Sequence, residues 1–398
     1  MKNTRVVVGM SGGVDSSVAA YLLKEQGYDV VGLFMRNWND ASVTLEDECP
    51  WIDDSRDAMM VAEQLGIPFQ VIDLSVEYKQ RIVDYMFSEY QAGRTPNPDV
   101  LCNREIKFDI FLDNALKLGA DFVATGHYVQ KSEVIQNEVV EYKLIAGHDP
   151  NKDQSYFLCQ LNQFQLSKAL FPIGGMLKPE VRKIAEMQNL VTASKKDSQG
   201  LCFIGKVSLP EFLQQQLSTK IGRVIEIDEH LPKLKSHLDS ISNLEIQDER
   251  RLAKLIFEPS DGKVIGDHQG AHFYTIGQRK GLNIGGKPKP LFVLQTNVVD
   301  NVIYVGQGEE HPGLMNSGLL ILKKDAHWVR PSMKSLVLNS KETFCRIRYR
   351  QELFGCSMTE KENGDICLYF NALKKSVTPG QFAAVYLDGE LVFSGVIS

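Results

Sequence analysis

The chain has 398 residues, of which 43% are hydrophobic and 24% charged, and its formal net charge is −6. This composition predicts a globular protein of two or three domains, and the acidic balance excludes a uniformly basic nucleic-acid binder while allowing local basic faces. No stretch approaches the roughly 18 consecutive apolar residues of a membrane span, and strand-forming sequence begins close to Met1. We therefore expect a cytoplasmic protein without membrane association.

The first unit along the chain is a strand, a glycine-rich turn and a helix. Residues 5–8 form a short β-branched run that predicts a buried strand, and after "GMSGGVDSS" (residues 9–17) apolar residues recur at helical spacing until Gly27. Main-chain N–H groups and the positive dipole end of such a helix converge on an anion. The turn has neither the lysine of the Walker pattern nor the spacing of the dinucleotide fingerprint, so it predicts a different nucleotide chemistry.

Strands and helices then alternate along the chain. The pattern predicts strands over 29–35, 68–74 and 121–129, and helices over 55–66, 76–93 and 106–119. This alternation predicts an α/β fold, a doubly wound parallel sheet with helices on both faces. Ligands of such sheets bind beyond the carboxyl ends of the strands, so we expect Met35, Gly126 and His127 to share one pocket with the turn.

The pattern changes after about residue 163. The next stretch, to 225, reads as a small helical and turn-rich central region, and 226–258 reads as a charged helical or mobile insertion. From there to the end, short β-rich runs such as 272–277 and 343–350 alternate with turn residues, which predicts a C-terminal β-barrel. The expected divisions are 1–163, 164–225, 226–258 and 259–398.

Several motifs together carry a family resemblance. "SGGVDSS" resembles the loop of the PP-loop ATP pyrophosphatases, which split ATP between the α and β phosphates, and the whole chain resembles the bacterial tRNA-specific 2-thiouridylases. The matching segments, in the family's order, are "GMSGGVDSSVAAYLL", "TPNPDVLCNREIKF", "ATGHYV", "KDQSYFL", "SQGLCFIG", "HFYTIGQRKGL", "RIRYRQ" and "VTPGQFAAVY". The resemblance implies a PP-loop domain of the adenine nucleotide α-hydrolase type, a central tRNA-binding region and a β-barrel.

The resemblance places ATP, with Mg²⁺, at the glycine-rich turn. Attack at the α phosphorus expels pyrophosphate, an anion that a nest of amides and serine hydroxyls can hold without a Walker lysine. Asp15 is expected to help place Mg²⁺ or to orient the loop. The expected ATP-binding residues are Gly9, Met10, Ser11, Gly12, Gly13, Val14, Asp15, Ser16, Ser17, Met35 and Gly126.

The implied reaction exchanges the C2 oxygen of the wobble uridine of a tRNA for sulfur. Adenylation lets that oxygen leave as AMP, and the sulfur comes from a cysteine persulfide. The resemblance assigns the persulfide to Cys202 and the nucleophile to Cys102, whose final exchange would leave a disulfide that a reducing compartment reopens. Asp99, three positions before Cys102, is expected to act as a general acid or base.

The other cysteines have a plainer interpretation. The seven cysteines are scattered without a C-x-x-C pair, which argues against a zinc site or a disulfide framework, and no protein metal site is expected. Isolated cysteines in apolar surroundings are most often small buried hydrophobes. We expect this of Cys159, Cys345 and Cys367.

Contacts with the anticodon region of tRNA are also implied. On the residues alone, "PNPD" is by default a turn, His127 a strand-end histidine, and the alternating arginines of 346–350 a solvated strand face. Phosphate contacts would give affinity and a flipped base would give selectivity. The expected tRNA-binding residues are Asn97, Pro98, Asp99, His127, Lys152, Asp153, Gln154, Arg348, Tyr349, Arg350 and Gln381.

The family implies tRNAs such as those for Glu, Gln and Lys as substrates, and a cysteine desulfurase or a sulfur-relay protein as partner. Two other functions stay open: a PP-loop ligase that forms an amide or guanidino group from an adenylate, and a non-catalytic, ATP-sensing RNA-binding protein. A ligase would need an ammonia source or an amino acid site, but not two reactive cysteines. Cys102 therefore discriminates among the three.

Overall fold

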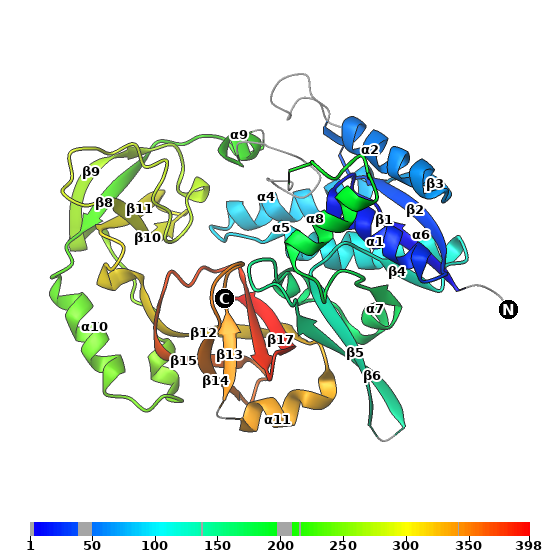
Figure 1. The fold of residues 1–398 in the computed structure, drawn as a ribbon. Coiled ribbons are helices and arrows are strands. Elements are labelled where there is room, and N and C mark those ends of the chain that lie inside the picture. The colour runs from blue at the N-terminus through cyan, green and yellow to red at the C-terminus, as the bar shows by residue number, and fades with distance from the viewer. Residues whose placement is uncertain (1–3, 39–49, 137, 197–208, 215, 341) are drawn as a thin grey trace.

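The computed structural model describes residues 4–38, 50–136, 138–196, 209–214, 216–340 and 342–398. It contains a parallel sheet with its helices, a β-barrel, and a smaller four-stranded sheet. Figure 1 shows the parallel sheet, in blue and cyan, on one side of the molecule, the small sheet on the opposite side, and the barrel below and between them. Among the described residues, no helix combines the length and the apolar character needed to cross a membrane.

The parallel sheet has the order β3-β2-β1-β4-β7. Its strands are β1 (Arg5–Gly9), β2 (Asp29–Arg36), β3 (Phe69–Asp73), β4 (Phe122–Ala124) and β7 (Ala169–Leu170), and every neighbouring pair is parallel. The chain moves outward in both directions from β1, so the carboxyl ends of β1, β2 and β4 surround the switch point where ligands of such sheets bind. The predicted strand at 121–129 is shorter than expected and ends at Ala124.

Helices cover both faces of this sheet, as predicted. Val6 and Val8 pack with α1 (Val14–Glu25), α2 (Pro50–Leu65) and α8 (Lys178–Met187), whereas Val7 packs into the cluster on the other face. Alternate residues of one strand point to opposite faces, so the valine run of β1 supplies both cores. The doubly wound α/β prediction is therefore confirmed.

The second face carries two long helical stretches. The first comprises α3 (Ser75–Tyr78), a π-helical turn (Lys79–Val83) and α4 (Asp84–Gln91), and the second comprises α5 (Pro98–Leu101), a π-helical segment (Cys102–Ile110) and α6 (Phe111–Lys117). The second stretch begins eight residues before the predicted start at 106 (106 − 98 = 8). "PNPD" is a helix start rather than a plain turn, because Asn97 caps the N–H of Val100 at 3.2 Å and proline fits the first helical position.

A hairpin links the parallel sheet to the barrel. Its strands β5 (Val129–Gln136) and β6 (Val139–Ala146) are antiparallel, and β6 pairs with β17 (Glu390–Ile397). Arg330 reinforces this joint with two hydrogen bonds to the Glu390 carboxylate, at 2.7 and 2.8 Å. Both side chains are buried.

The C-terminal barrel is confirmed. Its strands are β12 (Met315–Trp328), β13 (Thr343–Arg346), β14 (Phe354–Glu360), β15 (Ile366–Lys375), β16 (Phe382–Leu387) and β17. They follow the order β12-β15-β14-β13-β16-β17, and pairing of β12 with β17 closes the barrel, while α11 (Lys334–Asn339) lies against β14. The expected strand over 343–350 is wrong in its second half, because β13 ends at Arg346 and Arg350 has a φ of 63°.

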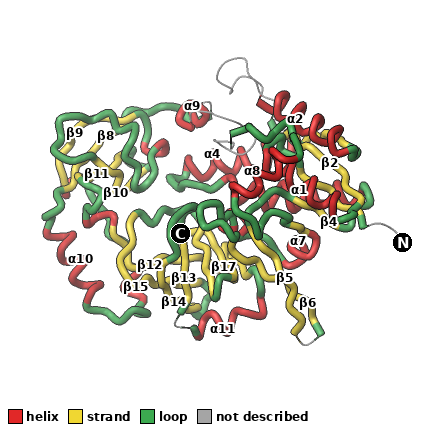
Figure 2. The backbone as a smooth tube through the Cα atoms, viewed as in Figure 1, coloured by secondary structure: helices red, strands yellow, loops and turns green. Residues whose placement is uncertain are grey.

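The region before the barrel differs from the expectation of a single β unit. A separate sheet is formed by β8 (Gly222–Ile227), β9 (Gly262–His268), β10 (Leu291–Asn297) and β11 (Val302–Gln307). Strand β8 falls where a helical region was expected to meet the charged insertion, and α10 (Pro232–Ser242) then accounts for the helical character of 226–258. The predicted strand at 272–277 is wrong, since 271–273 form a 3₁₀ turn without a sheet partner. Figure 2 shows α10 below the small sheet, at the outer left edge of the molecule.

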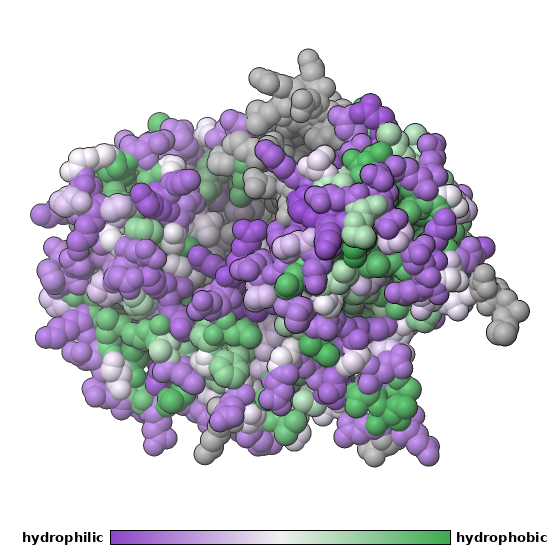
Figure 3. All heavy atoms as spheres, in the orientation of Figure 1, coloured by the Kyte–Doolittle hydropathy of each residue, from purple (hydrophilic) through white to green (hydrophobic). Residues whose placement is uncertain are grey.

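Seven shorter elements complete the described chain. Two are the helices α7 (Gln163–Lys168) and α9 (Leu209–Gln214), and five are 3₁₀ turns: Ser155–Leu158, Glu249–Leu252, Pro259–Asp261, Pro312–Leu314 and Pro331–Met333. The face seen in Figure 3 is mainly hydrophilic, with small separate hydrophobic areas.

Candidate active site

The glycine-rich turn joins β1 to α1 as predicted. Gly13 caps the helix without a side-chain hydrogen bond, so the first N–H groups of α1 face the turn. Gly12 has a φ of +72°, and a Cβ there would lie 2.2 Å from the main-chain oxygen of Asp54. At Gly126, a Cβ would lie 2.6 Å from the backbone nitrogen of Ser16. Both positions need glycine, and Gly126 is brought against the loop as expected.

The serines of the loop hold its shape. The hydroxyl of Ser17 donates to the carbonyl of Gly13 at 2.8 Å, and that of Ser16 accepts from the N–H of Ser11 at 3.1 Å. Ser16 and Ser17 are buried, while Ser11 is exposed. Within the predicted ATP-binding set, the side chain of Ser11 is exposed, whereas those of Met10, Val14 and Met35 lie in the cores and leave only their main chain to a ligand.

Asp15 is the charged group of the loop. Its carboxylate accepts a hydrogen bond from the Tyr128 hydroxyl at 2.7 Å and forms an ion pair with Lys178 at 2.8 Å. No group of three or more His, Cys, Asp or Glu side chains that could hold a metal occurs in the described part of the chain. Mg²⁺ commonly binds through one or two carboxylates together with substrate phosphates. Asp15 lies at the glycine-rich turn that is predicted to bind phosphate, so it could act as such a carboxylate ligand.

His127 lies immediately beyond the carboxyl end of β4. It is 8% exposed, its Nδ1 lies 2.7 Å from the Thr125 hydroxyl, and its ring is flanked by Phe108 and Phe171. Burial, and secondly the positive charge of Lys107, hold the pKa of His127 well below its usual 6.5. The imidazole is therefore neutral at neutral pH, so it can form hydrogen bonds with a ligand but does not provide a positive charge.

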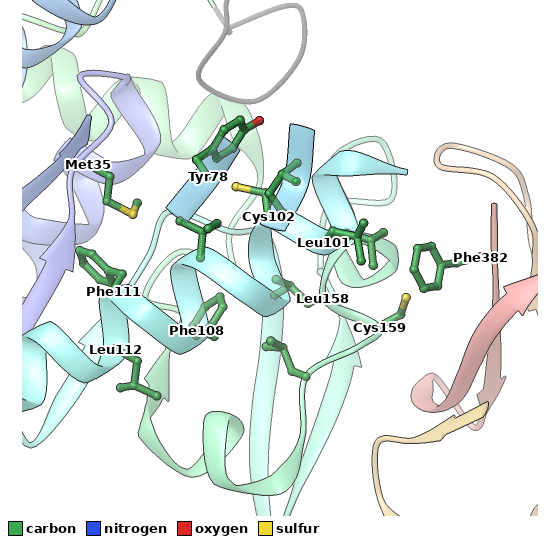
Figure 4. Packing of buried hydrophobic residues seen from close by; sticks show 14 of the residues in the cluster. Met35, Tyr78, Leu101, Cys102, Phe108, Phe111, Leu112, Leu158, Cys159 and Phe382 are labelled. Carbon is green, nitrogen blue, oxygen red and sulfur yellow. The ribbon is translucent and has the colours of Figure 1, made fainter. Parts of the chain in front are cut away.

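Cys102 follows α5 on the π-helical segment, one turn after Asp99. Its side chain is fully buried in the cluster that includes Tyr78 and Leu101, and Figure 4 shows its sulfur directed toward Tyr78. The helix places Asp99 and Cys102 on one side, because residues three apart are neighbours on a helical surface. Cys202, the predicted persulfide carrier, lies outside the described residues.

The cysteines expected to be structural are buried as predicted. Cys159, Cys345 and Cys367 are all 0% exposed. Burial raises the pKa of Cys159 to about 12 and raises that of Cys345 well above its usual value. Such thiols stay protonated at neutral pH and are poor nucleophiles.

A cavity of about 460 Å³ opens beside Asp99. That volume lies within the range of roughly 300–1,000 Å³ that is common for ligand pockets. The start of α5, the loop before β10 and the barrel all contribute to its wall. The lining residues are Asn97, Asp99, Phe157, Thr275, Ile276, Gly277, Gln278, Arg348, Tyr349, Thr378 and Gln381.

Five predicted tRNA-binding residues meet at this cavity. The ring of Tyr349 packs on Phe157 with centroids 4.2 Å apart, and Gln381 donates to the carbonyl of Thr95 at 2.9 Å. Arg348 donates through Nη2 to the carbonyls of Ile276 and Ser376 at 3.1 and 2.9 Å. These hydrogen bonds connect the parallel-sheet part of the chain, the loop before β10 and the barrel around the cavity. The five are Asn97, Asp99, Arg348, Tyr349 and Gln381.

Other predicted tRNA contacts are used inside the protein. Asp153 is 6% exposed, accepts hydrogen bonds from Gly147 and Ser155, and pairs with the buried Arg346 at 3.0 Å. The side chain of Gln154 accepts from the N–H of Tyr128 at 3.0 Å.

The remaining predicted contacts are more accessible. Pro98 and Lys152 are half-buried, and Arg350 is exposed beside the Tyr349 ring. The expected single arginine face is wrong, because Arg346 is a buried ion-pair partner and Arg348 and Arg350 follow the strand.

Comparison with known proteins supports one family. Residues 4–206 match a model described as the tRNA methyl transferase HUP domain, 247–307 match a tRNA methyl transferase PRC-barrel domain, and 319–397 match an aminomethyltransferase beta-barrel domain. Proteins named tRNA-specific 2-thiouridylase MnmA from Christiangramia forsetii and Flavobacterium johnsoniae are each 59% identical to this chain, over 99% of it and 100% of their own length. One from Alkaliphilus oremlandii is 45% identical over 99% of this chain and 96% of its own.

The chain belongs to the tRNA-specific 2-thiouridylase family.

Within this 2-thiouridylase fold, sequence reasoning missed one charged residue of the loop site. Lys178 is 163 positions from Asp15 in the chain, yet its ammonium contacts both carboxylate oxygens. No local pattern signals such a pair. The only hint is that Lys178 opens an amphipathic helix with proline at its second residue, which fixes where that helix starts.

Proposed function

We propose that this protein adenylates the C2 oxygen of the wobble uridine of tRNA at the expense of ATP and replaces it with sulfur from a cysteine persulfide. The observation that carries the proposal is the placement of Asp99 and Cys102. Helix α5 and the π-helical segment that continues it place Asp99 in the wall of a cavity of about 460 Å³ and Cys102 one turn further along the chain. The ATP loop lies at the carboxyl edge of the same sheet unit.

ATP and Mg²⁺ bind at the turn between β1 and α1 in this proposal. The N–H groups at the start of α1 and the helix dipole face the phosphates, and Asp15 offers an oxygen ligand to the metal. The departing pyrophosphate is held by the same main-chain groups. Gly126 lets β4 approach the loop closely, so the end of that strand can line the nucleotide site.

The cavity beside Asp99 is the proposed binding place for the target base. Tyr349 and Phe157 provide aromatic faces on which an unstacked base can stack. Asn97 and Gln381 also line the cavity, and their amides hydrogen-bond to each other and to the main chain around α5, which holds this wall in place. Asp99 lies where it can exchange a proton with the base during adenylation. In this proposal the half-buried Lys152 and the exposed Arg350 contact the RNA backbone.

The sulfur step balances with two cysteines. The Cys102 thiolate attacks the Cys202 sulfur of the persulfide, which forms a Cys102–Cys202 disulfide and releases hydrosulfide. Hydrosulfide then attacks C2, the adenylated oxygen leaves as AMP, and a cellular thiol reductant reopens the disulfide. Because Cys102 is buried in the described structure, its sulfur must be uncovered before this step.

The substrates in this proposal are tRNAs for Glu, Gln and Lys, in the cytoplasm. The sulfur reaches Cys202 from a cysteine desulfurase or a sulfur-relay protein. A reducing compartment fits the required reopening of the disulfide. Amide or guanidino ligation is disfavoured, since neither reaction uses a thiol at the position of Cys102.

The test is a reconstituted reaction analysed by mass spectrometry of nucleosides. Purified protein, unmodified tRNA for Glu, MgATP and a persulfide donor should yield 2-thiouridine together with AMP and pyrophosphate. Cys367→Ala is the matched cysteine control, because Cys367 is buried in the barrel, and it should keep the activity. A methylated or amidated nucleoside, or no ATP-dependent product, would overturn the proposed reaction.

A further inference from the structure

A buried lysine from a distant part of the chain, Lys178, contacts the ATP loop. Lys178 places its ammonium 2.8 and 2.9 Å from the two carboxylate oxygens of Asp15, and its side chain is 9% exposed. The same ammonium lies 5.8 Å from the centre of the Tyr128 ring. Tyr128 also donates to Asp15, so the three side chains form one connected group.

The position of Lys178 is fixed by the fold. Lys178 is the first residue of α8, and its N–H donates to the carboxylate of Asp149 at 3.0 Å. Helix α8 packs on α1 through Val181 and Ala185. Beyond α8, the hydroxyl of Thr192 donates to that of Ser17 at 3.0 Å, so the segment is attached to α1 at a second point.

This is an unfavourable place for a cation unless anions are near. Lys178 stands at the N-terminus of α8, and its ammonium reaches the N-terminal turn of α1, where Asp15 is the second helical residue. Both helix ends carry partial positive charge, and removing an ammonium from water is costly without a partner. Asp15 supplies negative charge at the ammonium, and Asp149 supplies it at the main-chain N–H of Lys178. A triphosphate at the loop would supply more.

We propose that Lys178 binds the β and γ phosphates of ATP and then the pyrophosphate product, in the role that the Walker lysine has in other loops. Asp15 holds the ammonium when no nucleotide is bound. With MgATP bound, the Asp15 carboxylate would hold Mg²⁺ and the Lys178 ammonium would turn to the phosphates, which would also limit repulsion between Asp15 and the phosphates. This inference rests on the proposed ATP site.

The test compares ligands with and without the outer phosphates. Binding of the uncleavable α,β-methylene analogue of ATP, of Mg-pyrophosphate and of AMP is measured by calorimetry for the wild-type protein, Lys178→Met and Lys178→Arg. Charge-assisted hydrogen bonds contribute about 1.5–3 kcal/mol each, so Lys178→Met should weaken the analogue and pyrophosphate about tenfold or more, with AMP changed less than about twofold. Lys178→Arg should retain part of the difference. Lys183→Met, an exposed lysine on the same helix, is the control and should bind all three ligands normally.

A second comparison separates phosphate binding from mere positioning of Asp15. In the Asp15→Asn background, Lys178→Met should still weaken the analogue and pyrophosphate relative to Asp15→Asn alone. The double variant removes both charges of the pair together, so that neither charge is left without its partner.

Three results would overturn the proposal. They are unchanged binding of pyrophosphate by Lys178→Met, equal losses of affinity for AMP and for the analogue in that variant, and no further loss of affinity when Lys178→Met is added to Asp15→Asn. If AMP and the analogue both failed to bind the wild-type protein, the ATP site itself would be wrong instead.

Discussion

Gly126→Ala tests whether close contact between β4 and the loop shapes the ATP site. A Cβ at this position would lie 2.6 Å from the backbone nitrogen of Ser16 and 2.7 Å from the carbonyl carbon of Asp15, whereas ordinary contacts begin at 3.4 Å. The loop backbone or the strand must therefore yield by about 0.8 Å (3.4 − 2.6). Hydrogen bonds to a phosphate do not survive a displacement of that size, because their donor–acceptor distances vary only between about 2.7 and 3.2 Å.

The expected result is a folded protein with poor nucleotide binding. Loss of one charge-assisted hydrogen bond weakens binding by about 1.5–3 kcal/mol, or roughly 10- to 150-fold. Overpacking at the contact lowers the free energy of unfolding by about 1–3 kcal/mol. Calorimetric titration with the α,β-methylene analogue of ATP measures the first quantity and urea unfolding measures the second.

Gly285→Ala is the matched control for this substitution. A Cβ at Gly285 meets nothing within 4 Å, so the variant should bind the analogue and unfold like the wild-type protein. If Gly126→Ala bound the analogue as tightly as the control, the loop would not depend on that close approach and the reasoning would be refuted.

Three further predictions concern the cavity, the joint between hairpin and barrel, and the buried histidine. Tyr349→Ala should raise the KM for tRNA about tenfold, because stacking on a base contributes roughly 1–3 kcal/mol. The control Phe344→Ala, on the exposed side of β13, should leave the KM unchanged. Equal KM values for the two variants in a steady-state assay would contradict the base pocket. Arg330→Met should lower the free energy of unfolding by about 3 kcal/mol, because it leaves Glu390 buried without its main partner, and adding Glu390→Gln should recover part of the loss; no recovery in urea unfolding would count against this. The pKa of His127 in the folded chain is well below 6.5, the usual value for histidine. Below pH 6.5 the unfolded chain therefore binds a proton at this residue that the folded chain does not. The free energy of unfolding is highest above pH 6.5 and decreases as the pH falls. Thermal unfolding of His127→Asn should therefore depend less on pH between 7 and 5 than that of the wild-type protein, and identical slopes would show that His127 is not responsible.

Local patterns in the sequence predicted the ATP-binding half of the fold well. The β-branched run of β1, the glycines of the turn and the apolar spacing of α1 are properties of neighbouring residues, so they can be read without a structure. The C-terminal barrel was also visible from its short runs and turn residues. The start of α5 was missed because proline and asparagine, which signal a turn, also suit the first position and the cap of a helix.

Features that depend on distant residues could not be predicted. Strand β8 is short and stands beside a charged segment, and only its partners β9 and β11 stabilise it as a strand. The arginines after Thr343 alternate as in a strand, but Arg346 is buried against Asp153 and the chain turns directly afterwards. The pairing of Lys178 with Asp15 is likewise set by the packing of α8 on α1 and has no local signature.

The measurement that tests the central claim most directly separates adenylation from sulfur transfer in one reaction. Cys102→Ser is incubated with tRNA, MgATP and a persulfide donor, and both the pyrophosphate released and the 2-thiouridine formed are quantified. The account predicts that pyrophosphate still appears, at up to one equivalent of tRNA, while 2-thiouridine is absent. Formation of 2-thiouridine at the wild-type rate by this variant would contradict it.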